Sequence, residues 1–300
     1  MRKLMTMFTV KKWVLLGLVI LPAVMLFLTG WKKPSLGDIG KVVNQAKTVK
    51  KLIKSFEDIS PEQEYYIGRA VGATVAGQYK VYKNKKATMY VNTLGQTLAQ
   101  ASDRPETFGG YHFLILDSDE INAFAAPGGL VFITRGMLRC TENEDALAAV
   151  LAHEIGHVQH QHGLQSIKKS RFSSMAADVA LDAVQSRTGG AASVLTGVFQ
   201  DSIHDVTTTM ITNGYSRKFE KEADNAAVAI LKRVGYDPNG LIDMLNVMKE
   251  RLNPKGNDFA KTHPSPSDRI KDVKKKIGKY VEVEKSAARQ ARFETALKDI

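Results

Sequence analysis

The sequence predicts a mainly helical α+β fold with one small β-sheet beside a central helix. Apolar residues recur at helical spacing through most of the chain, whereas strand-like runs bounded by turn residues are confined to residues 111–133. The 300 residues can form one large domain or two small ones, and a content of 44% hydrophobic and 24% charged residues is ordinary for a folded protein. Disorder of the whole chain is therefore not expected.

The first thirty residues predict a targeting segment. Residues 1–12 carry four basic residues and no acidic one, and an uncharged apolar run over 13–30 follows. That order is typical of a signal peptide or a signal anchor, and a run of ~18 residues is at the short end for spanning a bilayer. Trp31 stands where a lipobox would carry its cysteine, which excludes lipid attachment. We expect residues 1–31 to be a signal peptide or an N-terminal membrane anchor, with the rest of the chain outside the cytoplasm.

Residues 32–59 are expected to form a linker that contains an amphipathic helix. Apolar residues recur at helical spacing over residues 39–56, with lysines between them. Ser60 then begins the next helix, because a proline follows it and Gln63 completes a capping box. That helix is expected to end near Gln78.

Further helices and three short strands follow along the chain. The predicted strands cover residues 111–116, 123–126 and 130–133, and the predicted helices cover residues 88–102, 142–162, 217–234, 239–252 and those from Ser267 onward. A second capping box, Thr141–Glu144, begins the helix over 142–162, whereas Ser216 begins and Gly235 ends the helix over 217–234. Residues 165–212 are rich in small residues and are expected to form helices broken by a mobile stretch.

The charge of the chain argues against a nucleic-acid partner. The net charge is +11, and its basic residues gather at the N-terminus and over residues 47–54, 80–86 and 271–279. No aromatic residues interleave with them and no nucleic-acid-binding signature occurs, so we interpret them as solvated faces with some attraction to anionic lipid head groups. The single cysteine, Cys140, excludes an internal disulfide and a thiolate metal cluster.

The helix over 142–162 contains the pattern His153-Glu154-Ile155-Gly156-His157. Histidines four residues apart project from one face of a helix, within reach of one metal ion. Glu154 is rotated by about 100° from His153, so it can flank the metal without binding it and accept a proton from a water molecule. Gly156 leaves space beside the two imidazoles.

The residues themselves leave the third metal ligand open. A catalytic zinc takes three protein ligands and keeps one open position. The candidates are Glu220, Glu222, His160, His162, His204 and His263. Only one of the two glutamates can face the metal, because they lie about 200° apart on their helix. Asp224 follows Glu220 by one turn and could orient a ligand imidazole through its second nitrogen.

These motifs together resemble the metallopeptidase family of the CAAX prenyl protease, HtpX and the periplasmic BepA/LoiP-like proteases. The resemblance covers about residues 60–275. Its motifs are Ser60-Pro61-Glu62-Gln63-Glu64, Asn122-Ala123-Phe124-Ala125 with Pro127-Gly128-Gly129, the helix motif, Tyr215-Ser216-Arg217 with Glu220 and Asp224, and Thr262-His263-Pro264 with Arg269. The chain lacks the several spanning segments of the integral-membrane relatives, which points to the single-anchor or soluble periplasmic branch.

The resemblance implies a zincin-like (gluzincin) catalytic domain over residues 60–280 that binds one Zn²⁺ per subunit, followed by a basic C-terminal helix or tail over 281–300. It implies metal ligands and catalytic residues as follows: His153, His157 and Glu220 bind zinc, Glu154 acts as general base, and Asp224 supports the site. It implies that residues 122–125 (Asn122, Ala123, Phe124 and Ala125) line the substrate cleft. His263 and Arg269 are regulatory or oxyanion-stabilising candidates.

The sequence therefore predicts a zinc-dependent endopeptidase of the cell envelope, periplasmic or otherwise extracytoplasmic, that acts in protein quality control. Its expected partners are polypeptides, either envelope or misfolded proteins, and a membrane through the N-terminal segment. The alternative hypothesis is a chaperone-like or binding protein with a latent zinc site that His263 blocks. Replacing Glu154 by Gln separates the two, because only the protease would lose its function.

Overall fold

A computed structural model of the chain describes residues 59–166, 203–251, 263, 266–281 and 286–300. The chain divides into two units, Met1–Leu52 and Ile53–Ile300, and all described residues belong to the second. The predicted targeting segment, the helix over 39–56 and most of the stretch over 165–212 lie outside the described residues. Among the helices that the structure describes, none is both long and apolar enough to cross a membrane.

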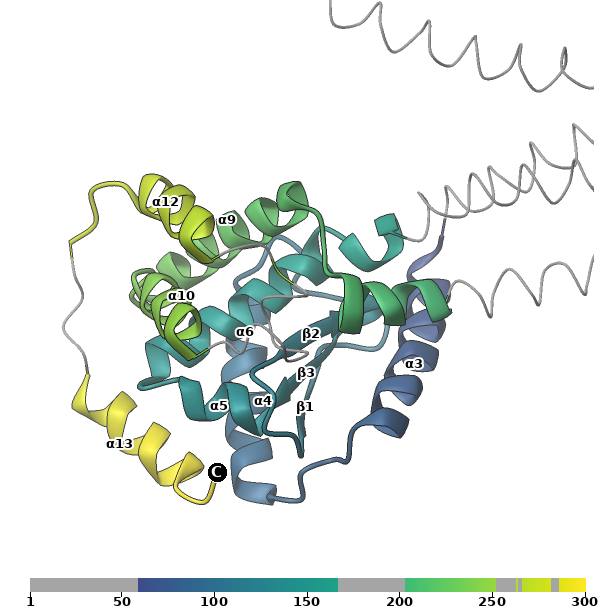
Figure 1. The fold of residues 1–300 in the computed structure, drawn as a ribbon, viewed down its shortest axis with the longest axis horizontal. Helices are drawn as coiled ribbons and strands as arrows, with labels where there is room; N and C mark the ends of the chain where they lie inside the picture. Colours follow the sequence, from purple (N-terminus) through teal and green to yellow (C-terminus); the bar gives the residue numbers. More distant parts are fainter. Residues whose placement is uncertain (1–58, 167–202, 252–262, 264–265, 282–285) are drawn as a thin grey trace, which may run out of the picture. The chain divides into compact units, whose positions relative to one another are not determined.

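The described part is mostly helical and contains one sheet of three strands, as the sequence predicts (Figure 1). In chain order the elements are α3 (Pro61–Gln78), α4 (Lys85–Gln100), β1 (His112–Leu116), β2 (Ala123–Ala126), the 3-10 turn η1 (Pro127–Gly129), β3 (Leu130–Thr134), α5 (Arg135–Cys140), α6 (Glu144–Gln159), the π-helical turn η2 (Thr209–Asn213), α9 (Arg217–Val234), α10 (Gly240–Arg251), α12 (Pro266–Ile277) and α13 (Ala287–Leu297).

The sheet has the strand order β1-β3-β2, with β1 parallel and β2 antiparallel to β3. Successive side chains of a strand point to opposite faces, and here both faces are covered. Ile115 and Ile133 enter a core formed with α4, α6, α9 and α10. Phe124 and Phe132 enter a second core formed with α3, Leu164 and the segment over 203–213. The sheet is therefore the middle layer between two sets of helices.

Helix α6 is the central element of the larger core. All its residues from Glu144 to Val158 are buried, and it contacts the sheet, α4, α9 and α10. A helix that is buried on all sides has no solvent-exposed face on which charged side chains could be hydrated. The polar side chains that α6 does carry must therefore find partners or a ligand inside the protein.

Local sequence signals account for most helix ends. The Ser60–Gln63 capping box has both of its hydrogen bonds. The Ser216 hydroxyl accepts a hydrogen bond from the Phe219 amide, and Gly235 ends α9 in the left-handed conformation (φ 74°) that glycine adopts without strain. These three boundaries confirm the sequence-based predictions.

The start and the end of α6 differ from the prediction. Asn143, not Thr141, is the N-cap, and its side chain accepts from the Ala146 amide. Thr141 instead donates to the Leu138 carbonyl, because it ends the short helix α5, which the sequence analysis missed. At the other end α6 stops at Gln159, and Gln161 has a positive φ of 54°. The chain therefore turns before His162 instead of continuing the helix through it.

The C-terminal helix α13 packs against α4 and α6. The buried Glu144 carboxylate in the first turn of α6 accepts hydrogen bonds from Arg292 of α13 and from the hydroxyls of Tyr90 and Tyr236. Residues 281–300 hold as many acidic as basic side chains, so the expectation of a basic segment was wrong. This segment attaches by specific ion pairs and hydrogen bonds instead of by net charge.

Candidate active site

The predicted site lies where α6 and α9 are in contact, and Gly156 allows their close approach. A Cβ at position 156 would lie 2.9 Å from both the Cα and the carbonyl oxygen of Ala223 on α9. Only glycine fits such a contact between two helix backbones. The space that Gly156 provides is thus filled by α9, the helix that carries Glu220 and Asp224.

Four side chains bring their ligand atoms within 4.8 Å of one another: His153, His157, Glu220 and His263, here called the His-Glu cluster. The Nε2 atoms of His153 and His157 are 3.1 Å apart. The Glu220 carboxylate lies 3.5 Å from Nε2 of His153 through Oε2 and 3.4 Å from Nε2 of His157 through Oε1. All four side chains are buried.

Two properties of the cluster suit a zinc ion: the type of its donor atoms, and a buried oxygen that has no hydrogen-bond partner among the described residues. Two imidazoles and one carboxylate are a ligand set that catalytic zinc takes. Glu220 Oε1 is buried and has no hydrogen-bond partner among the described residues, a state that costs about 1–3 kcal/mol per group unless a cation offsets it. Burial lowers the pKa of His157 to about 3, so its imidazole is neutral and can offer a lone pair.

Asp224 and Arg269 hold the far side of His153. Asp224 Oδ1 lies 2.9 Å from Nδ1 of His153, and Arg269 contacts both Asp224 oxygens at 2.6 and 3.0 Å. Burial raises the pKa of Asp224, but the Arg269 charge and His153 outweigh it and lower the value to about 2. For His153, burial and the Arg269 charge lower the pKa, but its hydrogen bonds to Asp224 and Glu220 outweigh them and raise it to about 9. A metal ion that binds there displaces a proton.

Glu154 is the buried acid beside the cluster. Its side chain is 1% exposed, and neither carboxylate oxygen has a hydrogen-bond partner among the described residues. Burial raises the pKa of Glu154 to about 7. A carboxyl group whose pKa lies near neutral pH can both take and return a proton.

Tyr215 is a cluster neighbour to which the sequence analysis gave no role. Its ring stacks on that of His157 with centroids 4.4 Å apart, and its buried hydroxyl has no hydrogen-bond partner among the described residues. The signal was available, since Tyr215 directly precedes the Ser216 cap of the helix that carries Glu220. A cap fixes where the preceding residue lies relative to the first helical turn.

His263 is the fourth member of the cluster. Its Nδ1 atom lies 2.7 Å from Glu220 Oε2, and its ring centroid is 5.3 Å from that of His153. Burial lowers the pKa of His263. The structure thus brings together every residue predicted as metal ligand, base, support or regulator, whereas their roles stay predictions.

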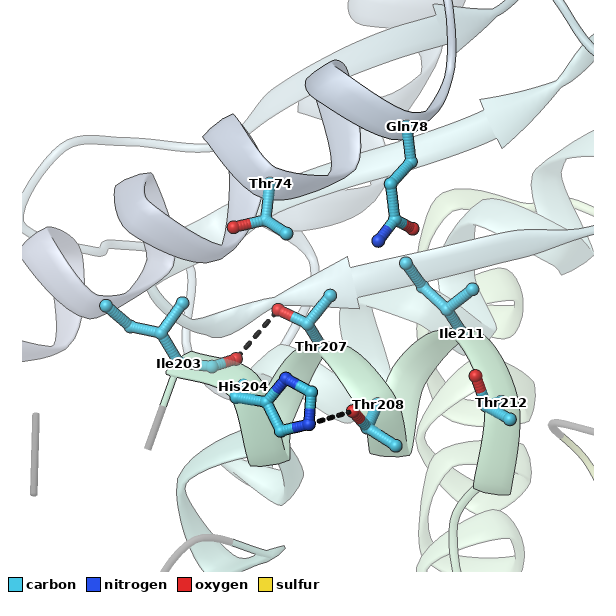
Figure 2. Close-up of a pocket in the computed structure, with 8 residues that line it drawn as sticks. All are labelled: Thr74, Gln78, Ile203, His204, Thr207, Thr208, Ile211 and Thr212. Carbon is cyan, nitrogen blue, oxygen red and sulfur yellow. Dashed lines mark hydrogen bonds between the residues drawn. The ribbon is translucent and has the colours of Figure 1, made fainter. Parts of the chain in front are cut away.

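The remaining histidine and glutamate candidates lie apart from the ligand atoms of the cluster. His162 and Glu222 contact each other behind His157. His160 stacks on His162. His204 is exposed and lines a pocket of 290 Å³ between α3 and the segment over 203–213 (Figure 2). No residue of the His-Glu cluster lines this pocket.

The predicted substrate-cleft residues are buried in this conformation. Asn122, Ala123, Phe124 and Ala125 are at most 3% exposed. β2 is the edge strand next to the site, but η2 and α6 both pack against it. Figure 2 shows the helical segment over 203–213 lying beside α3, with Thr207 and Ile211 pointing toward the pocket. The role of residues 122–125 stays a prediction.

Two histidines one helical turn apart, a glutamate between them in sequence and a carboxylate from a second helix define a metallopeptidase site. The comparison with family models agrees, because the model of peptidase family M48 matches residues 85–277. The chain belongs to peptidase family M48, which makes it a hydrolase of the metalloprotease class.

Curated relatives support this assignment. The Beta-barrel assembly-enhancing protease of Escherichia coli (strain K12) is 30% identical over 223 residues, which are 72% of this chain and 44% of the relative. That of Yersinia pestis is 28% identical over 244 residues, covering 73% and 47%. The Mitochondrial metalloendopeptidase OMA1 of Schizosaccharomyces pombe is 27% identical over 225 residues, covering 73% and 63%. The matched regions span less than half the length of the two bacterial relatives.

Proposed function

We propose that the chain is a zinc-dependent endopeptidase of the cell envelope that cleaves envelope or misfolded proteins. The observation that carries the proposal is the buried His-Glu cluster on α6 and α9, with Glu154 beside it and without a hydrogen-bond partner among the described residues. The proposed catalytic domain covers residues 60–280 and has a zincin-like (gluzincin) fold. Membership in peptidase family M48 favours this enzyme over the chaperone-like alternative.

In the proposed site, His153, His157 and Glu220 hold one zinc ion per subunit. When bound, zinc supplies a Lewis acid that polarises a peptide carbonyl and lowers the pKa of water to ~7. Glu154 accepts the proton of the attacking water and returns it to the leaving amine. The burial that raises the pKa of Glu154 to about 7 suits both transfers.

Asp224 and Arg269 act on the orientation and charge of the site. Asp224 accepts the Nδ1 proton of His153, so that Nε2 presents its lone pair to the metal. Arg269 balances two carboxylates, since it contacts Asp224 and lies 3.4 Å from Glu220. Its buried guanidinium is also our candidate for stabilising an oxyanion.

His263 is proposed as a regulatory residue. It would complete four protein ligands around the zinc, and a fourfold protein site has no open position for substrate. The 2.7 Å contact between His263 and Glu220 supports this role. Release of His263 would reopen the site without any change in α6 or α9.

Substrate is proposed to bind as an extended strand along the edge strand β2. Strand addition satisfies main-chain hydrogen bonds without requiring a particular sequence, which suits a protease that acts on unfolded chains. Phe124 is buried in the second core with Val206 and Met210, so the segment over 203–213 is proposed to move aside when substrate binds.

The envelope location is proposed from the N-terminal sequence and the relatives. Residues 1–31 combine a basic flank with an apolar run and would act as a signal peptide or anchor. Two relatives bear names that refer to β-barrel assembly. Both observations support an extracytoplasmic domain near a membrane.

Comparing Glu154→Gln with the parent protein tests the proposal. The parent should contain about one zinc per chain by elemental analysis and cleave an unfolded polypeptide. Glu154→Gln should keep its zinc and lose ~10²–10⁴-fold in turnover, because only the proton acceptor is removed. His157→Ala is the matched control and should lose zinc as well. A zinc-free parent, or a Glu154→Gln variant with parent turnover, would overturn the proposal.

A further inference from the structure

His162 and Glu222, which the proposed function does not use, lie in line behind His157. The Nδ1 atoms of His157 and His162 are 2.9 Å apart, and His162 Nε2 lies 3.1 Å from Glu222 Oε2. His162 is fully buried, whereas the Glu222 side chain is 33% exposed. We propose that His162 and Glu222, here called the support pair, are positioning residues that hold His157 in the orientation and tautomer that zinc requires.

The zinc ion is that of the proposed function, on which this inference rests, and the roles of His162 and Glu222 follow from the proton positions. A histidine that offers Nε2 to a metal carries its proton on Nδ1. Nδ1 of His157 therefore donates to Nδ1 of His162, which must be unprotonated there. His162 then carries its proton on Nε2 and donates it to Glu222. Every proton along the line has one donor and one acceptor, and Glu222 sets the direction because a carboxylate only accepts.

The backbone is arranged to place His162 at that point. An α-helix that continued past Gln159 would carry a residue five positions after His157 away from its ring. The positive φ of 54° at Gln161 ends the helix instead, in a conformation that a residue with a Cβ rarely adopts. The Gln161 side chain donates to Glu64 of α3, which holds the turn. Such strain persists where surrounding contacts fix it, often at functional sites.

Ring packing fixes the orientation of His162 as well. Its ring stacks on that of Phe219, with centroids 4.3 Å apart and planes 10° from parallel. It also stacks on the ring of His160, with centroids 5.4 Å apart and planes 17° from parallel. Rotation of the ring would break these stacking contacts, so the packing keeps Nδ1 toward His157 and Nε2 toward Glu222.

The support pair provides a hydrogen-bond acceptor for Nδ1 of His157, as Asp224 does for Nδ1 of His153. The Nδ1 atom of His153 faces the Asp224 carboxylate directly at 2.9 Å. The Nδ1 atom of His157 reaches a carboxylate only through an intervening imidazole. Supporting residues of metal-bound histidines typically contribute ~10–100-fold to metal affinity, and the support pair should contribute at the lower end because its carboxylate is partly solvated.

Zinc affinity measured by chelator competition on the purified full chain tests the proposal. Glu222→Ala and His162→Phe should each raise the zinc Kd about 10-fold. The zinc Kd of the double variant should not exceed the higher of the two single-variant values, because both residues act through the same contact with His157. Phenylalanine keeps the stacked ring and removes both nitrogens. Glu222→Ala alters a partly exposed side chain, so it provides the result if His162→Phe does not fold.

Two further variants separate positioning from a structural role. Glu222→Gln keeps a hydrogen-bond acceptor for His162, and His162→Asn keeps an acceptor for His157 near the Nδ1 position. The zinc Kd of Glu222→Gln should therefore lie closer to the parent value than that of Glu222→Ala, and the Kd of His162→Asn closer than that of His162→Phe. Lys218→Ala removes a surface partner of Glu222, at 3.6 Å, without touching His162, and should leave the Kd unchanged. Melting of the metal-free proteins reports any loss of fold.

The outcomes distinguish this proposal from the proposed function. If the parent binds no zinc, the proposed function fails and takes the support pair with it. If the parent binds zinc and Glu222→Ala binds it equally well, only the support pair is overturned. A Kd that rises equally in Glu222→Ala and Glu222→Gln would also overturn it, because charge and not hydrogen bonding would then be responsible.

Discussion

Replacing Gly156 by Ala should weaken both the fold and the metal site, because α9 leaves no room for a methyl group. The new Cβ would lie 2.9 Å from the Cα and the carbonyl oxygen of Ala223, and 3.2 Å from the Ala226 Cβ. Backbone atoms at those distances cannot rotate away. The two helices must separate, and α9 carries Glu220 and Asp224 with it.

The size of the effect follows from the contact distances. Ordinary carbon contacts lie at about 3.5–4.0 Å, so the helices must part by roughly 0.5–1 Å. Overpacking of this kind costs about 1–3 kcal/mol, of which the better helix propensity of alanine offsets about 1 kcal/mol. The net loss of about 1 kcal/mol lowers Tm by roughly 2–4 °C for a domain of this size. Zinc affinity should fall more sharply, because ligand distances tolerate only about ±0.2 Å.

The assay is thermal unfolding of the metal-free protein together with zinc titration against a chelator. Gly77→Ala is the matched control, since Gly77 is an exposed residue of α3 whose added Cβ would meet nothing within 4 Å. It should raise stability slightly, by up to about 1 kcal/mol, and leave zinc binding alone. Parent values of both Tm and zinc Kd in Gly156→Ala would refute the argument that this glycine sets the α6–α9 distance.

Two further predictions concern stability. Glu144→Gln should cost about 1–3 kcal/mol in urea unfolding at pH 7, because the buried carboxylate loses charge-assisted hydrogen bonds from Arg292 and two tyrosines. Burial raises the pKa of Glu144, but these hydrogen bonds outweigh it and hold the pKa below 4.5. The stabilisation by the carboxylate is therefore complete above pH 4.5 and is lost as pH falls through the lowered pKa. If the difference in unfolding free energy between parent and variant did not narrow in acid, this prediction would be contradicted. Gly68→Ala should cost roughly 3 kcal/mol or more, because its Cβ would lie 1.8 Å from the Pro127 carbonyl oxygen, and a Tm within about 2 °C of the parent would count against that packing.

The sequence predicted the parts of the fold that depend on local signals. Ser60 and Ser216 cap helices with hydrogen bonds to nearby residues, so these boundaries are encoded within a few positions. Helix α5 was missed because its six residues follow a strand directly and have no periodic pattern long enough to detect. Its presence also explains the wrong cap, since Thr141 serves the end of α5.

The site was predictable in its residues and not in its contacts. The spacing of His153 and His157 follows from helix geometry alone. The choice between Glu220 and Glu222 depends on how α9 packs against α6, which no periodicity within α9 reveals. The contact between His157 and His162 depends on the left-handed turn at Gln161, a residue type with no preference for that conformation.

The division of the site between α6 and α9 also bears on how the protein folds. His162 and Glu222 come together across 60 residues of sequence, and Glu220 joins His153 and His157 over a similar separation. Contacts of that length form late, because the chain must first lose the entropy of closing a long loop. The helices can each form beforehand, yet neither alone offers a complete set of ligands. If His153, His157 and Glu220 are the ligands, tight zinc binding during refolding would therefore begin only when α9 docks onto α6, and its rate would report that docking step.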